Sequence, residues 1–171
     1  MNPEKDDPAV RRRQSLGDEH TTAWEQTLDE AKLLADERRQ NGWESTVVMS
    51  AHTDTVSRDM KDHDRFGLMH VIPNNHADTF TEWYDPETFT EDLVYGTSVN
   101  GVMFVAIELI DPEAERSIVV PCSYDMTRAH GMTESAAEEG ALYSYFKTIT
   151  GDTLGKFRHE TVEPLVTPPE A

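Results

Sequence analysis

The spacing of apolar residues near the start of the chain predicts a long helix followed by a buried strand. Four apolar side chains fall on one helix face: Trp24, Leu28, Ala31 and Ala35. Thr22 and Glu25 form a capping box at the start of this segment, and Gly42 supplies a stop signal after it. We therefore expect a helix over residues 22–40. The β-branched and apolar centre of residues 43–50 is typical of a strand.

The rest of the chain alternates strand-like runs with short helical segments. Apolar runs predict further strands over residues 65–73, 93–97, 102–110, 117–121, 141–149 and 156–160. Helical spacing predicts helices over residues 75–84 and 125–139, and the polar stretch 53–64 is expected to be a loop. Because strands joined by short connections favour antiparallel pairing, we expect an α+β fold. It should have a single mixed or mainly antiparallel sheet of about six to seven strands, with about three helices.

The length of 171 residues fits one domain with its own hydrophobic core. Residues 1–17 are polar and show no periodicity, so we expect a flexible leader. The proline-rich residues 164–171 are expected to form a flexible tail. A single α+β domain over residues 18–163 lies between them.

The charge balance is strongly negative. Acidic residues outnumber basic ones by 33 to 15, which gives a formal net charge of -18. Such a surface repels phosphates, so we expect no nucleic-acid partner. The acids are spread along the chain and lysine is scarce, a pattern typical of proteins from salt-accumulating archaea. Molar salt shortens the Debye length to roughly 3 Å and screens the repulsion between like charges. We therefore interpret the acidity as an adaptation to a salt-rich solvent.

The sequence also indicates a compartment. No apolar run is long enough to span a bilayer, and the first 30 residues lack the apolar core of a signal peptide. The single cysteine, Cys122, cannot pair within the chain or build a thiolate zinc site by itself. We therefore expect a soluble protein of the cytoplasm with no membrane partner.

Turn and strand signatures over residues 19–164 resemble those of a small haloarchaeal family of unknown function. The signatures are Gly42-Trp43, Arg65-Phe66-Gly67-Leu68, Val71-Ile72-Pro73-Asn74, Asp111-Pro112-Glu113-Ala114-Glu115, Val119-Val120-Pro121 and Glu138-Glu139-Gly140. The resemblance implies a single domain from a salt-adapted archaeon. It implies no activity and no site residue, because these signatures mark turns and strands.

His52 and Asp54 form the most prominent candidate for a metal site. Two residues apart on a strand, they point to one face and can share a metal ion. The pair is similar to the His-x-Asp motif of di-zinc aminoacylase and desuccinylase peptidases, and Asp59-Met60-Lys61 and Glu138-Glu139-Gly140 are similar to later motifs of that group. In those enzymes, however, the Asp-Met-Lys string lies well downstream, whereas here it follows almost at once. The chain is also far smaller than their catalytic domain.

Other possible metal ligands follow this motif. His63, His70 and His76 could complete a zinc or manganese site with His52 and Asp54. The alternative is structural: His63 lies in a surface loop, and His70 faces the core with a backbone partner. No His-x-x-x-His or Glu-x-x-His spacing fixes a metal geometry, so the sequence favours the structural alternative.

Two further residues could carry chemistry. Glu108 interrupts the apolar run of residues 102–110, and a buried carboxylate there could act as a general acid or base; a solvent-facing one would be structural. Cys122 stands at a strand end before a predicted helix, where a nucleophile could be activated, but a small core residue is the alternative. Neither a phosphate-binding loop nor a dinucleotide motif occurs, so we expect no cofactor.

The sequence therefore favours a non-enzymatic domain that binds a protein partner or a small ligand. A small metal-dependent hydrolase centred on His52 and Asp54 is the alternative. A free sheet edge favours a homodimer. We also expect no stoichiometric zinc, and stability that rises steeply with KCl and is partly rescued at low salt by acidification toward pH 5.

Overall fold

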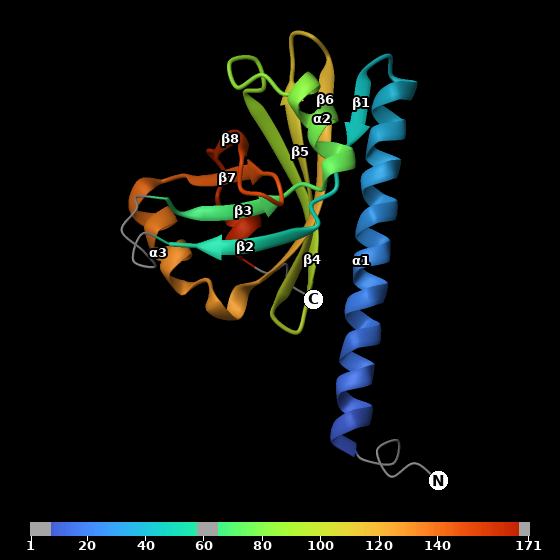
Figure 1. Ribbon diagram of the computed structural model, residues 1–171, viewed down its shortest axis with the longest axis vertical. Coiled ribbons are helices and arrows are strands. Elements are labelled where there is room, and N and C mark those ends of the chain that lie inside the picture. Colours follow the sequence, from blue (N-terminus) through green and yellow to red (C-terminus); the bar gives the residue numbers. More distant parts are fainter. Residues whose placement is uncertain (1–7, 58–64, 168–171) are drawn as a thin grey trace.

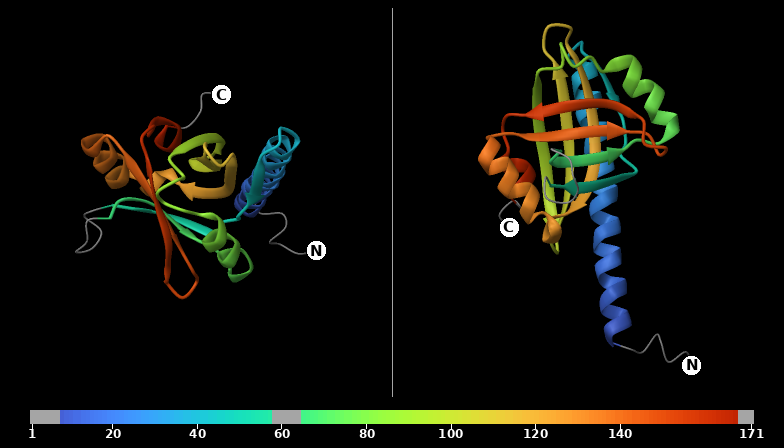
Figure 2. Two further views of the ribbon diagram at one scale, coloured as in Figure 1. Left: turned by 90° about the horizontal axis from the view of Figure 1, so that it is seen from above. Right: turned by 60° about the vertical axis from the view of Figure 1, so that its left-hand side comes forward.

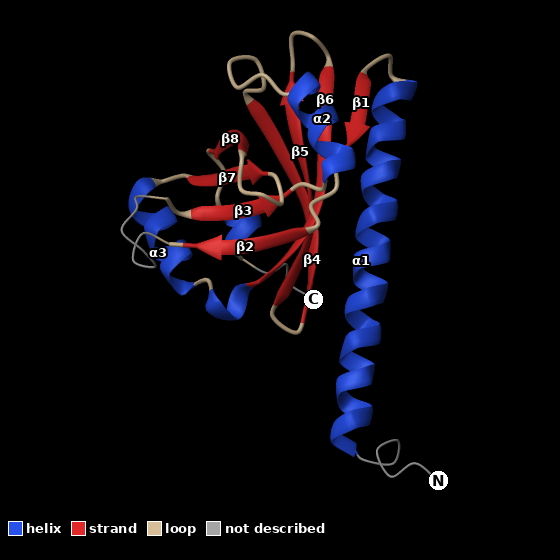
Figure 3. Ribbon diagram, viewed as in Figure 1, coloured by secondary structure: helices blue, strands red, loops and turns tan. Residues whose placement is uncertain are grey.

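The computed structural model describes residues 8–57 and 65–167, with side chains from residue 17 onward, and its strands form two sheets (Figures 1 and 3). Sheet A contains, in spatial order, β1 (Glu44–Val47), β6 (Arg116–Asp125), β5 (Val102–Asp111) and β4 (Glu91–Val99). Sheet B contains β2 (His52–Val56), β3 (Gly67–Val71), β7 (Leu142–Lys147) and β8 (Thr153–His159). Each sheet is mixed, because β1 pairs in parallel with β6 and β3 with β7, while the other pairs are antiparallel.

The two sheets pack face to face, and their strands cross at a steep angle (Figures 1 and 2). Side chains from both inner faces form one core, which includes Leu68 and Phe146 of sheet B and Ile107 and Ile118 of sheet A. All four are fully buried. Each sheet therefore has an inner face, which contributes to this core, and an outer face, which does not.

A long helix, α1 (Pro8–Gln40), lies along the outer face of sheet A, and its N-terminal part extends past the sheet (Figure 1). Small side chains line its inner side: Ala31 and Ala35 are buried against Ala106 and Val119. The helix backbone can therefore approach the sheet closely. None of the described helices, α1 included, is apolar enough over a sufficient length to span a membrane.

The remaining helices lie at the margins of the two sheets. They are α2 (Asn74–Trp83), the 3-10 helix η2 (Met126–Arg128), α3 (His130–Glu139) and α4 (Glu163–Val166). Of these, α4 contacts β4 of sheet A. In Figure 1, α2 and α3 lie at opposite ends of the sheet B strands. No described helix lies over the outer face of sheet B (Figure 2).

The expected α+β class is confirmed, but the single sheet of six to seven strands is wrong. The described residues form eight strands in two four-stranded sheets, with four α-helices. The error arises at residues 43–56, where the chain leaves sheet A after β1 and enters sheet B as β2. β2 is expected to be a loop because it is rich in polar residues. Its Thr53 is nevertheless buried, in a hydrogen-bond network, while Asp54 faces solvent.

Several element bounds also differ from the expectation. α1 begins at Pro8 rather than at Thr22, so residues 8–17, expected to be flexible, are helical; residues 1–7 lie outside the described residues. The helix expected over residues 125–139 is divided into η2 and α3, and it ends as expected at Gly140, whose φ of 72° is left-handed. The antiparallel meander of β4, β5 and β6 is confirmed.

Candidate functional site

The outer face of sheet B gathers side chains from four strands into rows. Every second side chain of a strand points to the same face, so paired residues on neighbouring strands align. One row contains Asp54, Met69, Tyr145 and Lys156, and the next contains His52, Val71 and Lys147. Cationic, aromatic and thioether groups that are distant in the sequence thus meet on one surface.

Two adjoining grooves hollow this face. Groove 1 has a volume of about 740 Å³ and is lined by β2, the end of β6 and η2, including Asp54, Asp125 and Arg128. Groove 2 has a volume of about 390 Å³, and its lining includes Arg65, Tyr145 and Lys156. Met69 and Lys147 line both grooves. The two grooves therefore meet at these two side chains.

The two acidic side chains that line groove 1 are engaged by their own neighbours. Asp54 Oδ1 lies 2.8 Å from His52 Nε2. Asp125 accepts hydrogen bonds from the hydroxyl and the backbone N–H of Thr127, which lower the pKa of Asp125. Neither Arg128 nor Lys147 forms an ion pair with a carboxylate in the described part of the chain. Lys147 is therefore available to a ligand, whereas Arg128 already interacts electrostatically with Asp125.

Aromatic rings orient the cations of groove 2. Lys156 Nζ lies 4.3 Å from the ring centroid of Tyr143 and 5.7 Å from that of Tyr145. The guanidinium carbon of Arg65 lies 5.8 Å from the ring centroid of Tyr145. The electron-rich ring faces attract these cations and hold them at the groove.

A metal site at His52 and Asp54 requires a third ligand close to these two side chains. Both side chains are exposed on one face of β2, and they bond to each other. Within residues 17–57 and 65–167, no three His, Cys, Asp or Glu side chains gather where they could hold a metal ion. His63 lies outside the described residues. His76 lines neither groove, and its Nδ1 accepts a hydrogen bond of 3.3 Å from the backbone N–H of Met49.

A separate polar feature lies inside the core, on the inner face of sheet B. Side-chain hydrogen bonds join β4 to all four strands of that sheet through Asp92, His159, Ser144, His70 and Thr53. His159 Nδ1 donates to Asp92 Oδ2 at 2.8 Å. Ser144 Oγ lies 2.7 Å from His159 Nε2 and 2.9 Å from His70 Nε2. His70 Nδ1 lies 2.9 Å from Thr53 Oγ1.

This buried network is structural rather than catalytic. The contacts of Asp92, His159 and Ser144 match those of a catalytic triad, but Ser144 is fully buried and a second imidazole occupies its other side. A substrate cannot reach its hydroxyl. His70 faces the core as expected, although its partners are two side-chain hydroxyls rather than the backbone. Burial, assisted by the neighbouring charge of His159, lowers the pKa of His70 to about 3.

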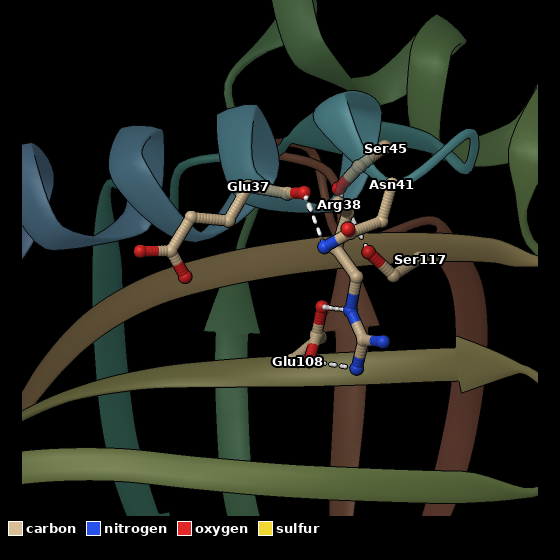
Figure 4. A network of polar contacts seen from close by, with 6 residues as sticks. All are labelled: Glu37, Arg38, Asn41, Ser45, Glu108 and Ser117. Atoms are coloured by element: carbon tan, nitrogen blue, oxygen red, sulfur yellow. Dashed lines mark hydrogen bonds and ion pairs between the residues drawn. The ribbon is translucent and has the colours of Figure 1, made fainter.

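Glu108 belongs to the contact between α1 and the outer face of sheet A, away from both grooves. Arg38 donates from Nε and Nη2 to its two carboxylate oxygens at 2.9 and 3.0 Å (Figure 4). The Glu108 side chain is only 1% exposed. Beside it the hydroxyls of Ser45 and Ser117 share a hydrogen bond of 2.7 Å. Glu108 therefore anchors the C-terminal end of α1.

Cys122 is a core residue. It is fully buried, and burial raises the pKa of its thiol to about 12. The thiol therefore stays protonated at neutral pH and is a poor nucleophile.

Sequence reasoning missed the cationic residues of the grooves and most of the buried network. Alternation within residues 141–149 could have shown Tyr143, Tyr145 and Lys147 on one face, opposite Ser144. No signal in the sequence could have paired Asp92 with His159, because they belong to different sheets.

Comparison with protein families gives this architecture a context. The model of a family of unknown function, DUF7529, matches residues 10–167. The chain belongs to this family. No curated protein and no solved structure matches it. Membership of DUF7529 confirms the expectation of a family without known function; the haloarchaeal source stays a prediction.

Proposed function

We propose that this member of DUF7529 is a non-enzymatic domain that binds a small ligand on the outer face of sheet B. One observation carries the proposal: grooves 1 and 2 adjoin on a sheet face that no described helix covers. The outer face of sheet A, by contrast, is occupied by α1. Groove volumes of about 740 and 390 Å³ lie within the range of known ligand sites, roughly 300 to 1,000 Å³.

The chemistry of the grooves favours binding over reaction. Catalytic acids and bases are held in desolvated positions that shift their pKa values, whereas His52 and Asp54 are both exposed on an edge strand. The residues that line both grooves, Met69 and Lys147, offer apolar contact and one positive charge.

We further propose a setting for the domain. Its net charge of -18 supports a salt-rich cytoplasm and argues against a nucleic-acid partner. Homodimer formation is supported by β4, a nine-residue strand at an edge of sheet A on which Leu93 is 45% exposed. No feature of the described surface supports a membrane partner.

The ligand site can be tested with amide NMR spectra of the full chain. A panel of neutral, cationic and anionic small molecules is titrated, and the cross-peaks that shift are mapped onto the structure. We expect at least one compound to shift the peaks of β2, β3 and β7 around Met69.

A matched pair of variants tests the location. Met69→Trp fills both grooves and should weaken binding at least about tenfold, which corresponds to about 1.4 kcal/mol. Leu33→Trp places the same ring on an exposed position of α1 and should leave binding unchanged. Binding that survives Met69→Trp, or a panel in which no compound shifts these peaks, would contradict the proposed function.

A further inference from the structure

Taken together, the linings of the two grooves contain more cations than acids, although the molecule as a whole is strongly negative. Resting on the ligand site proposed above, we propose that the ligand is a small molecule with at least two anionic groups. In this ligand one anionic group bonds to Lys147, where the grooves meet, and a second reaches Arg128 in groove 1 or Lys156 in groove 2.

The distribution of charge carries this inference. Four of the chain's 15 basic residues line the two grooves: Arg65, Arg128, Lys147 and Lys156. Of its 33 acidic residues, the described linings contain only Asp54 and Asp125. Random placement in so acidic a chain would give the reverse ratio. The grooves therefore form a local positive region on a negative molecule.

The acidic neighbours offset only part of this positive charge. Asp125 interacts electrostatically with Arg128, whereas Asp54 bonds to His52. In the part of the chain that the structure describes, Lys147 and Lys156 form no ion pair with a carboxylate. Their ammonium groups therefore have hydrogen-bond donors free for an incoming anion.

The arrangement favours more than one anionic group. Lys147 lies at the end of β7 and lines both grooves, so an anion bound to it is close to the cations of either groove. Lys156 is held over the ring of Tyr143, which limits the conformational freedom that binding would have to remove. A ligand with a single negative charge would leave one of these cations unsatisfied.

The same charge argument sets an upper limit on the ligand. A long polyanion would extend beyond the grooves onto a surface that contributes to a net charge of -18 and would be repelled there. We therefore assign the site to a small molecule rather than to a nucleic acid.

Calorimetric titration of the full chain with three probes tests this inference. The probes are pyrophosphate, citrate and neutral glucose, which distinguish phosphate from carboxylate anions and both from an uncharged compound of similar size. Each titration uses the lowest KCl concentration at which circular dichroism shows the chain to be folded. We expect at least one of the two anions to bind, and to bind more weakly as KCl increases, while glucose does not bind.

Two charge-neutralising variants localise the effect. Lys147→Gln should weaken anion binding roughly tenfold, because it removes the cation common to both grooves. Lys32→Gln removes the same charge from an exposed position of α1 and should change the affinity by less than about twofold. Amide spectra of both variants confirm that the fold is intact.

The outcomes separate this inference from the proposed function. A neutral compound that binds beside Met69 while both anions fail would overturn the anionic ligand and leave the binding site standing. Equal affinity of Lys147→Gln and the wild-type protein would also overturn it. A fourth titration uses a single-stranded oligonucleotide, and tighter binding of this polymer than of either anion would overturn the assignment to a small molecule. If no compound binds, both proposals fail.

Discussion

Acidification should destabilise the fold through His70. This imidazole is fully buried between Thr53 and Ser144, and its pKa is lowered to about 3 from an ordinary value of 6.5. Below pH 6.5 the unfolded chain takes up a proton at this position, whereas the folded protein does not. The contribution of His70 to stability is therefore complete above pH 6.5 and is lost as the pH falls toward 3.

The magnitude follows from the width of that pH window. Each unit of difference between the folded and unfolded pKa values corresponds to about 1.4 kcal/mol, so the full loss is about 5 kcal/mol. Between pH 7 and pH 5 the loss is about 2 kcal/mol. This is a large fraction of a total stability of roughly 5 to 15 kcal/mol.

The assay is urea unfolding followed by tryptophan fluorescence at constant KCl, for the wild-type protein and His70→Gln. The variant is expected to be less stable at pH 7, because glutamine cannot reproduce both imidazole contacts. Its stability should depend less on pH, so the difference between the two proteins should shrink by about 2 kcal/mol between pH 7 and pH 5. Carboxylates contribute equally to both proteins and cancel in this difference.

Ser117→Ala is the control for loss of a buried polar group. Ser117 is fully buried in sheet A and has no charge that titrates, so its removal should lower stability by the same amount at every pH. A His70→Gln profile that stays parallel to the wild type would refute the argument. The same effect opposes the rescue by acid expected at low salt, which should therefore be larger in His70→Gln than in the wild-type protein.

Four further predictions follow from the contacts and the charge. Arg38→Ala leaves the carboxylate of Glu108 buried and unpaired, and it should lower the free energy of unfolding in urea by about 3 kcal/mol. Arg39→Ala removes an exposed ion pair and should lower it by less than about 1 kcal/mol. Equal losses would contradict the anchoring role of Glu108. His52→Ala should leave stability nearly unchanged, and elemental analysis should find no stoichiometric zinc; one equivalent of metal, lost on this substitution, would refute both expectations. The melting temperature should rise steeply with KCl, and a flat profile would show that the acidity is not a salt adaptation. Light scattering in high salt should give a dimer mass, and 19.4 kDa under all conditions would exclude one.

The sequence predicted the elements in which one physical signal dominates. The meander of β4, β5 and β6 has continuous apolar runs separated by turn residues, and the structure contains it as expected. The Gly67 signature also has a physical reason, because a Cβ at that position would collide with the carbonyl group of Tyr143 on the paired strand. The meander can be inferred from a single sequence, whereas the contact of Gly67 with the distant strand β7 is visible only in the structure.

The division into two sheets could not be predicted in the same way. Residues 43–50 are predicted as one strand because their centre is β-branched and apolar. Backbone hydrogen bonds to β6 continue as far as Ser50, and the chain then enters sheet B as β2. β2 has the polar composition of a loop. Its buried residue Thr53 is held in place by hydrogen bonds to Ser50 and His70. Local composition does not reveal a strand whose burial depends on polar partners distant in the sequence.

The candidate site depends on the same polar partners. Side chains alternate along a strand, so a shift of one residue in the pairing of β2 with β3 would turn Thr53 outward and His52 and Asp54 inward. Apolar contacts specify the register of β2 only weakly, because the strand is so polar. The hydrogen bond between Thr53 and His70 forms only when these two residues lie opposite each other. The buried network therefore determines which side chains reach the outer face of sheet B, although none of its imidazoles is exposed there.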